Sequence, residues 1–152
     1  MERKLMKELI ESLQQNRKVI IKDKEYKVKS KVWYTLEEDN TASYVKCQLN
    51  DNKILVIIPE DKLIYVGNII PDMVYERLEE NKIKYEGELF DKTGEGHQFI
   101  VQIVFENQEE VEGKCIFEDY ESEHHIISLG LLDNKERADV YAEIIDISEI
   151  QF

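Results

Sequence analysis

The 152-residue chain has little of what marks flexible linkers, disulfide scaffolds and metal sites. Two prolines and six glycines do not make a linker, so we expect a single domain over residues 1–152. Two cysteines and three histidines include no Cys-x-x-Cys and no histidine pair at helical spacing, so we predict no metal and no cofactor. No run approaches the roughly 18 apolar residues of a membrane span, and the charged first residues lead us to expect no signal peptide. We therefore expect a cytoplasmic protein without membrane contact.

Positive charge is scarce beyond the first 35 residues. Residues 1–35 carry ten Lys/Arg against five Asp/Glu, although the whole chain has a formal net charge of −13. Residues 106–123 alone hold eight acidic residues and one lysine. Nucleic-acid binding needs a basic face, so this balance argues against a nucleic-acid partner. The acidic segment is either a solvated surface or a binding surface for a basic protein, and a homodimer is compatible with the opposite charges of the two regions.

The remaining pattern occurs twice along the chain. Each half contains a strand, an acidic turn, a strand with a central Lys-Cys pair, an apolar strand, a polar turn and a strand with a central tyrosine. Such self-similarity indicates two copies of one structural unit. The predicted strands are 26–34, 44–49, 54–58 and 63–66 in the first half, and 99–105, 111–117, 125–132 and 139–142 in the second.

Two segments outside this repeat predict helices. Apolar residues at helical spacing in residues 2–15 form one stripe, which we expect to dock on a sheet. Residues 72–81 follow Pro71 and predict a short helix that connects the two units. Residues 91–96 are rich in turn-forming types and predict an exposed loop. The stripe of the first helix consists of Leu5, Met6, Leu9, Ile10 and Leu13.

These elements together predict a mainly β protein, at the margin of the α+β class. We expect two similar antiparallel units, residues 18–70 and 85–152, to pack as a barrel or sandwich related by a pseudo-twofold axis. Residues 54–58 are apolar on both parities, which predicts a strand covered on both faces. The tail, 147–152, is too apolar for a free terminus and is expected to be packed.

Two aromatic residues are candidates for a ligand platform. Trp33 and Tyr44 lie off the main apolar rows of their predicted strands. Beside Lys31 and Lys46 they would form a small aromatic and cationic surface. The alternative is that both rings pack under a helix.

Four further candidates cluster around the end of one predicted strand: Asp119, Tyr120, His124 and His125. Asp119 shares the parity of the apolar row, so it either caps a turn through backbone hydrogen bonds or belongs to a carboxylate site. Adjacent histidines in a strand point to opposite faces, so His124 and His125 are not expected to bind one ion together. We treat the four as binding residues and predict no metal site among them.

No residue is predicted to be catalytic. The chain contains no Gly-x-Ser-x-Gly motif of a serine hydrolase. Cys47 and Cys115 occupy matching positions of the two halves, where they form either a disulfide or two reduced core residues, and the second alternative suits a cytoplasmic protein. A thiol in apolar surroundings is inert, because its thiolate is disfavoured there.

Three stretches resemble the bacterial domain-of-unknown-function family number 4178. They are residues 25–28, residues 44–49 with 54–56, and residues 111–120 with 126–129, where an Asp-Tyr pair closes a strand. The resemblance covers residues 25–146 and leaves the N-terminal helix outside. It implies a repeated β architecture and an intracellular bacterial setting, and it assigns no catalytic residue.

Three functions are compatible with this sequence. The first is a non-catalytic binding or accessory module, because no catalytic constellation is present. The second is a small acidic inhibitor or immunity-type protein that blocks a basic toxin or nuclease, which the charge distribution suggests. The third is a hydrolytic enzyme with a site near Asp119 and His124.

Overall fold

The computed structural model describes residues 2–35, 44–103, 114–132, 137 and 139–152, which form a mainly antiparallel β structure with an N-terminal helix. The helix is α1 (Glu2–Asn16). The strands before residue 70 are β1 (Lys18–Ile21), β2 (Lys24–Thr35), β3 (Tyr44–Leu49), β4 (Lys53–Ile58) and β5 (Leu63–Ile69). The later elements are β6 (Glu76–Glu79), β7 (Lys82–Tyr85), β8 (Glu88–Ile103), β9 (Lys114–Glu121), β10 (His125–Leu132), β11 (Val140–Ile145), the 3-10 helix η1 (Ile147–Glu149) and β12 (Ile150–Gln151).

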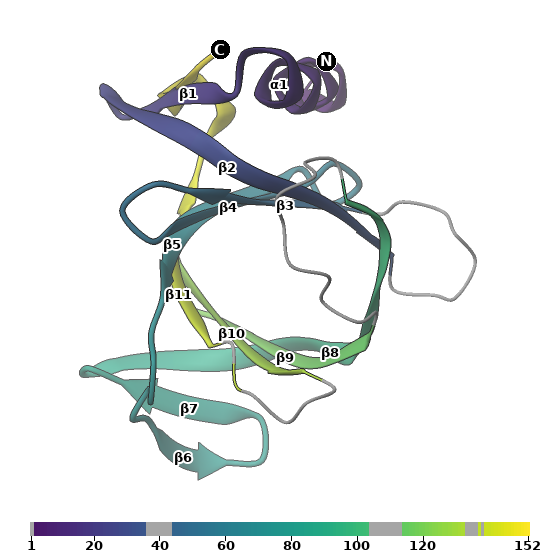
Figure 1. The fold of residues 1–152 in the computed structure, drawn as a ribbon. Coiled ribbons are helices and arrows are strands. Elements are labelled where there is room, and N and C mark those ends of the chain that lie inside the picture. The colour runs from purple at the N-terminus through teal and green to yellow at the C-terminus, as the bar shows by residue number, and fades with distance from the viewer. Residues whose placement is uncertain (1, 36–43, 104–113, 133–136, 138) are drawn as a thin grey trace.

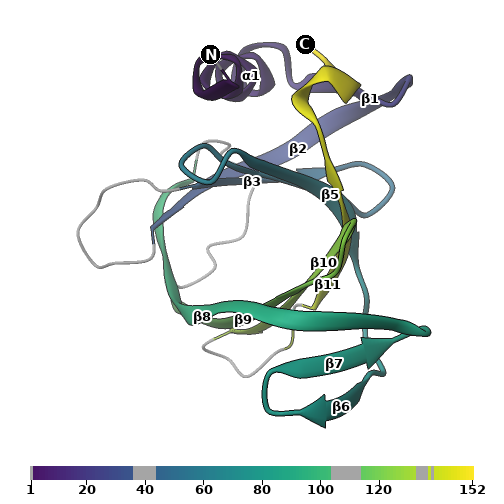
Figure 2. The same ribbon diagram turned by 180° about the vertical axis from the view of Figure 1, so that it is seen from behind.

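The twelve strands of the described residues belong to one sheet. Its order is β12-β1-β2-β3-β4-β5-β11-β10-β9-β8-β7-β6, and β2 pairs in addition with β8. Strands β2 to β5 form a first meander and β8 to β11 form a second. All pairings within and between the two meanders are antiparallel. Figure 1 shows these eight strands arranged as a ring, and Figure 2 shows the same ring from behind.

Strands β2 and β8 are long enough to divide one edge between two partners. Residues 24–27 of β2 pair with β1, whereas residues 32–35 pair with β8. In the same way residues 88–91 of β8 pair with β7, whereas residues 99–103 pair with β2. The two short strands β1 and β7 therefore leave the ring, and each carries further structure on its outer side.

Helix α1 covers the outer face of the first meander. Its predicted apolar stripe is largely confirmed, although Leu5 stays 37% exposed. The stripe packs with the alternate residues Val45, Cys47 and Leu49 of β3 in one core. The buried stripe residues are Met6, Leu9, Ile10 and Leu13.

Strand β4 is covered on both faces, as predicted. Leu55 and Ile57 lie in the core under α1. Ile54 and Val56 lie in a second core, which faces the inside of the ring. Each of the four side chains is at most 2% exposed. The continuous apolar run of this strand thus arises because one face meets the helix and the other meets the opposite meander.

The connecting helix predicted over 72–81 is wrong, because the chain there forms β6, which pairs with β7 in a hairpin. Val74 and Leu78 are 85% and 43% exposed, whereas Met73 is partly buried against the core that contains Ile83 and Tyr85, so the three apolar residues of the predicted stripe do not share one buried face. A helix this short is marginal in water without packing. Pairing with the neighbouring strand satisfies the backbone instead.

The exposed loop predicted over 91–96 is also wrong. These residues lie inside the 16-residue strand β8, which pairs with β9 along this stretch. The register shifts between Lys92 and Gly94, which marks a β-bulge. Glycine within a strand is typical of such a bulge, and the sequence pattern of a bulged strand resembles that of a loop.

The β6–β7 hairpin covers the outer face of the second meander. Figures 1 and 2 both place it on the side of the ring opposite α1. A third core lies beneath it, so the ring has one apolar core inside and one on each of two outer sides. The buried residues of this third core are Ile83, Tyr85, Phe90, Tyr120, Ile127 and Leu129.

The C-terminal tail is packed, as predicted, although its last residue is exposed. β12 pairs with β1, and Ile150 is 5% exposed within the core under α1. η1 begins with a capping box, in which Asp146 accepts a hydrogen bond from the Ser148 N–H and Glu149 accepts one from the Asp146 N–H. Phe152 keeps 47% of its surface exposed.

Candidate functional site

The inner face of the ring carries an apolar core interrupted by polar side chains. Strand alternation places Lys46 of β3 and Ser128 of β10 on this face, together with Asp119 and Glu121 of β9. The four polar residues are each partly exposed. We call this set the inner polar group. The buried residues around it are Tyr44, Ile54, Val56, Tyr65, Ile126, Val140 and Ala142.

Asp119 is a carboxyl of the inner polar group with a raised pKa. Burial raises its pKa to about 6, and the negative charge of Glu121 acts in the same direction. A hydrogen bond from Ser128 and the positive charge of Lys46 oppose this effect without cancelling it. The Oδ1 atom is buried and has no hydrogen-bond partner among the described residues. A buried acceptor of this kind carries a desolvation cost of about 1–3 kcal/mol.

The charge of Asp119 acts on Tyr65 of β5, which belongs to the other meander. Its side chain is 6% exposed, and burial raises the pKa of the phenol well above its ordinary value. The charges of Asp119 and Glu121 raise that pKa further. The phenol therefore stays protonated and neutral. Groups from β3, β5, β9 and β10 thus act on one another across the inside of the ring.

A second polar cluster lies on the outer face, beneath the β6–β7 hairpin. Tyr120 is fully buried there, and its hydroxyl accepts a hydrogen bond from Arg77 at 3.1 Å and donates one to Glu118 at 3.1 Å. Lys92 lies 3.4 Å from the same Glu118 carboxylate. Although burial opposes it, these partners lower the pKa of Glu118. The cluster anchors the hairpin on the second meander.

A third cluster joins the beginning of β8 to the turn between β9 and β10. Glu88 accepts hydrogen bonds from the Ser122 hydroxyl and from Tyr141 at 3.4 Å, and His125 Nδ1 lies 2.9 Å from its Oε2 atom. The His125 ring stacks on Tyr141 with centroids 5.2 Å apart. Although burial opposes it, the hydrogen bonds from Ser122 and His125 lower the pKa of Glu88. The Glu88 carboxylate therefore accepts hydrogen bonds from three side chains.

Replacing Glu88 by glutamine is expected to lower the free energy of unfolding by about 1 kcal/mol near neutral pH, because the charged acceptor of three hydrogen bonds is lost. A carboxyl whose pKa is lower in the folded state than in the unfolded state stabilises the fold at pH values above the unfolded pKa. This stabilisation is lost as the pH falls through the folded pKa. The gap between wild type and Glu88→Gln should therefore close in acid. Urea unfolding at several pH values measures it. Glu79→Gln, on the exposed strand β6, is the control, and an equal effect of both changes would contradict the assignment.

The structure divides the six predicted site residues between different faces. Tyr44 and Asp119 lie on the inner face. Tyr120 and His125 belong to the outer clusters, while the side chain of His124 is 74% exposed and lies 3.7 Å from Glu123. Asp119 and the histidines therefore do not form one site.

The aromatic platform is only half described. The backbone of Trp33 pairs with Val45 and Gln102, but the side chains of Trp33 and Lys31 lie outside the described residues. Tyr44 is 9% exposed within the inner core.

Sequence reasoning missed several residues of these clusters. Glu88 and Ser122 belong to no motif, and only the pairing of β8 with β9 brings them together. Tyr65 appeared as the central residue of a strand, but its face could not be assigned. The signal that did exist was the parity of Asp119, which placed an acidic side chain on the apolar row of its strand.

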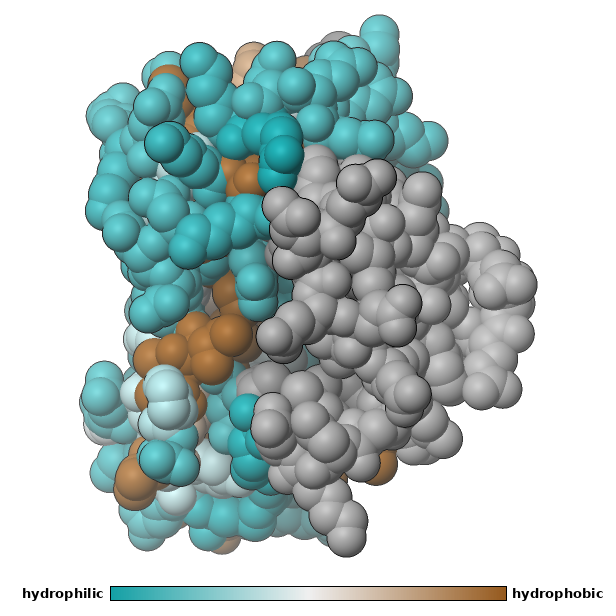
Figure 3. Space-filling view, in the orientation of Figure 1, coloured by the Kyte–Doolittle hydropathy of each residue, from teal (hydrophilic) through white to brown (hydrophobic). Residues whose placement is uncertain are grey.

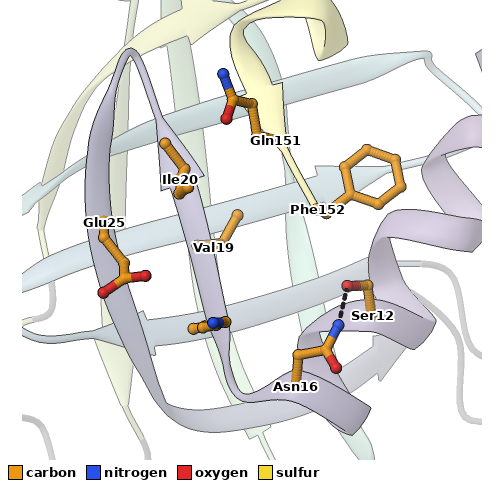
Figure 4. Close-up of a pocket in the computed structure, with 8 residues that line it drawn as sticks. Ser12, Asn16, Val19, Ile20, Glu25, Gln151 and Phe152 are labelled. Carbon is orange, nitrogen blue, oxygen red and sulfur yellow. Dashed lines mark hydrogen bonds between the residues drawn. The ribbon is translucent and has the colours of Figure 1, made fainter.

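A shallow pocket of about 260 Å³ lies outside the ring, and Figure 4 shows it between the end of α1, the β1–β2 hairpin and the C-terminal strand. Within it the Asn16 amide donates a hydrogen bond to Ser12 Oγ at 2.9 Å. The pocket lies where these three elements meet, and we assign no function to it. The lining residues are Ser12, Asn16, Lys18, Val19, Ile20, Glu25, Gln151 and Phe152.

The coloured part of the surface in Figure 3 is mostly hydrophilic, with apolar atoms in a band between the level of α1 and that of the β6–β7 hairpin. Within the described part of the chain, no three His, Cys, Asp or Glu side chains lie together as a metal-ion site. No helix among the described residues combines the length and apolar character that crossing a membrane requires.

Comparison with known proteins adds no relative. No family model matches the chain, and neither a curated protein nor a solved structure matches it. The resemblance to the family named above therefore stays a prediction.

Proposed function

We propose that the chain is a non-catalytic binding module, in which the eight strands of the ring close as a barrel that binds a small molecule on its inner face. One observation carries this proposal. The inner face holds a polar group drawn from several strands, and within it the Asp119 carboxylate has a buried oxygen without a hydrogen-bond partner among the described residues. The pairing of β2 with β8 supports the barrel.

Barrels of eight strands either fill their interior with side chains or hold one small ligand. Ligand sites are mostly apolar, with a few polar groups that fix the orientation of the ligand. The inner face fits this description, because seven buried apolar or aromatic residues surround the inner polar group. A purely structural interior would be more stable with apolar residues at these positions, since each buried polar group costs free energy.

The topology also supports the proposed internal repeat. Each meander has four strands in chain order, and the two meanders meet first strand to first strand and last strand to last strand. Each is preceded by a short strand, β1 or β7, that leaves the ring. Membership in the family that the sequence resembles, with its bacterial and cytoplasmic setting, remains a proposal alongside this one.

The hydrolytic alternative has less support than the binding module. A general acid or base near Asp119 would have to reach the same reacting atom, and hydrogen-bond distance is required for that. His125 belongs to the cluster around Glu88 on the outer face, whereas Asp119 belongs to the inner polar group. Neither histidine therefore shares a site with Asp119.

An inhibitor of a basic protein remains the second alternative. The acidic segment 106–123 suggested this function. Residues 106–113 of the segment lie outside the described residues. In its described part, Glu118 is paired with Arg77 and Lys92, while Asp119 and Glu121 face inward. Few of its described carboxylates are thus presented to a partner, and this favours the small-molecule proposal.

Binding on the inner face is tested with phenylnaphthylamine, a neutral fluorophore whose emission rises in apolar surroundings. We expect saturable binding of one molecule per chain. Ser128→Leu should abolish it, because a larger side chain would occupy the inner face beside Asp119. Ser148→Leu is the control on the exposed η1 helix. Circular dichroism checks that both variants fold, and equal binding to wild type and folded Ser128→Leu would refute the proposal.

A further inference from the structure

The unpartnered Asp119 oxygen specifies what the ligand must offer. A carboxylate oxygen accepts hydrogen bonds and donates none while it is ionised. Ser128 supplies one hydrogen bond to this carboxyl, and Oδ1 has no partner among the described residues. A ligand that completes the site therefore brings a hydrogen-bond donor to Oδ1.

The charges around Asp119 specify whether the ligand's donor group should be positively or negatively charged. Among the described residues, the charges that act on the Asp119 carboxylate are those of the Glu121 carboxylate and the Lys46 ammonium group, which makes two carboxylates against one ammonium group. Tyr65 adds no charge, because its phenol stays protonated. The inner polar group thus carries one excess negative charge when both carboxyls are ionised. In surroundings of low dielectric constant, a cation that balances this charge is favoured and an anion is repelled.

The surroundings of the inner polar group specify the body of the ligand. The adjacent core contains two tyrosines, Tyr44 and Tyr65, among aliphatic side chains such as Val56 and Ile126. Aromatic and aliphatic surfaces bind an apolar body, and tyrosine rings also attract cations.

We infer that the ligand of this site is a small hydrophobic amine, whose ammonium group donates a hydrogen bond to Asp119 Oδ1. This inference rests on the proposed function, since it names the ligand class of the same inner face. Asp119 is then the specificity-determining residue, and the apolar core supplies affinity without selecting for charge.

The assignment implies that binding weakens in acid. Protonation of Asp119, whose pKa is about 6, removes the charge that attracts the ammonium group. The other groups that act on this carboxyl are Lys46 of β3, Tyr65 of β5, Glu121 of β9 itself and Ser128 of β10. Burial raises the pKa of the Tyr65 phenol, so this side chain stays neutral over the same range.

Three probes of similar size test the inference: phenethylamine, phenethyl alcohol and hydrocinnamate. Each competes with phenylnaphthylamine for wild type, Asp119→Asn and Glu123→Gln, the last being an exposed control. Phenethylamine should bind wild type about tenfold or more tightly than the alcohol, because charged hydrogen bonds are the stronger ones. Asp119→Asn should remove this preference, whereas Glu123→Gln should keep it.

Two outcomes separate this inference from the proposed function. If the three probes bind alike, or hydrocinnamate binds best, while Ser128→Leu still abolishes binding, the amine assignment is overturned and the binding site remains. If neither phenylnaphthylamine nor any probe binds folded wild type, both fail. NMR titration of the Asp119 carboxyl carbon is a second readout, because a bound amine should lower the midpoint of that titration.

Discussion

Replacing Gly67 by alanine is expected to destabilise the protein strongly, although it adds only one methyl group. Gly67 lies in β5, opposite Ala142 of β11. A Cβ atom there would stand well under 3.0 Å from the Tyr141 carbonyl oxygen and from the Ala142 Cα atom. Both are backbone atoms, so the clash can be relieved only by moving β11 away from β5.

The pairing of β5 with β11 is one of the two seams between the meanders, and β2 with β8 is the other. We therefore expect Gly67→Ala to lower the free energy of unfolding by about 3 kcal/mol or more, at the upper end of what overpacking costs. Urea unfolding measures the loss. Hydrogen exchange should show that the amides of β5 and β11 lose protection first.

Gly94→Ala is the matched control for this prediction. A Cβ atom at Gly94 in β8 would meet nothing within 4 Å. Its effect should stay within about 1 kcal/mol, because an open site adds no clash. If Gly67→Ala unfolds at the same urea concentration as wild type, the close approach of β5 and β11 does not exist in solution.

Replacing Asp119 by asparagine is expected to stabilise the protein near neutral pH. Burial raises the pKa of this carboxyl from 3.8 to about 6, so the folded state binds the proton more tightly than the unfolded state does. Stability from this group is therefore fully present below the unfolded pKa and is lost as pH rises through about 6. The loss amounts to at most about 3 kcal/mol, at 1.36 kcal/mol for each pH unit of the difference.

Asparagine carries no charge at any of these pH values and does not suffer this loss. The variant and wild type should thus be equally stable at about pH 3, and the variant should be more stable at about pH 7.5. Urea unfolding across this range measures the gap, with Glu123→Gln as an exposed control. A gap that does not change with pH would show that the pKa of Asp119 is not raised in the folded protein.

Asp119→Asn is expected to raise stability and to impair binding. The same change should stabilise the fold and remove the preference for an amine. Groups that cost stability and serve binding are a common compromise at functional sites. A variant that became more stable without losing ligand discrimination would make Asp119 a defect in packing and not a binding residue.

Much of the fold follows from local patterns in the sequence. The stripe from Met6 to Leu13 predicted α1, and the run at 54–58 predicted a strand buried on both faces. Alternation also placed Asp119 on the apolar row of its strand. These features could be predicted because side-chain periodicity depends only on backbone geometry, which is the same in every helix and strand.

The errors came from segments whose structure depends on distant partners. Residues 72–81 contain three apolar positions compatible with a helix, but pairing with β7 makes part of them a strand. Residues 91–96 resemble a loop, but β9 continues the ladder through a bulge at Lys92 and Gly94. Local propensity is weak in both, so long-range pairing decides their structure.

The sequence by itself determined which residues share a face, whereas the tertiary structure decided what each face meets. Val45, Cys47 and Leu49 form an apolar row that periodicity detects, yet this row packs under α1 and not against the opposite meander. Asp119, Lys46 and Tyr65 are far apart in the sequence, and they act on one another only because β3, β5 and β9 lie on the same ring. The physical reason is that periodicity has a range of a few residues, whereas burial and charge act between all groups that folding brings together.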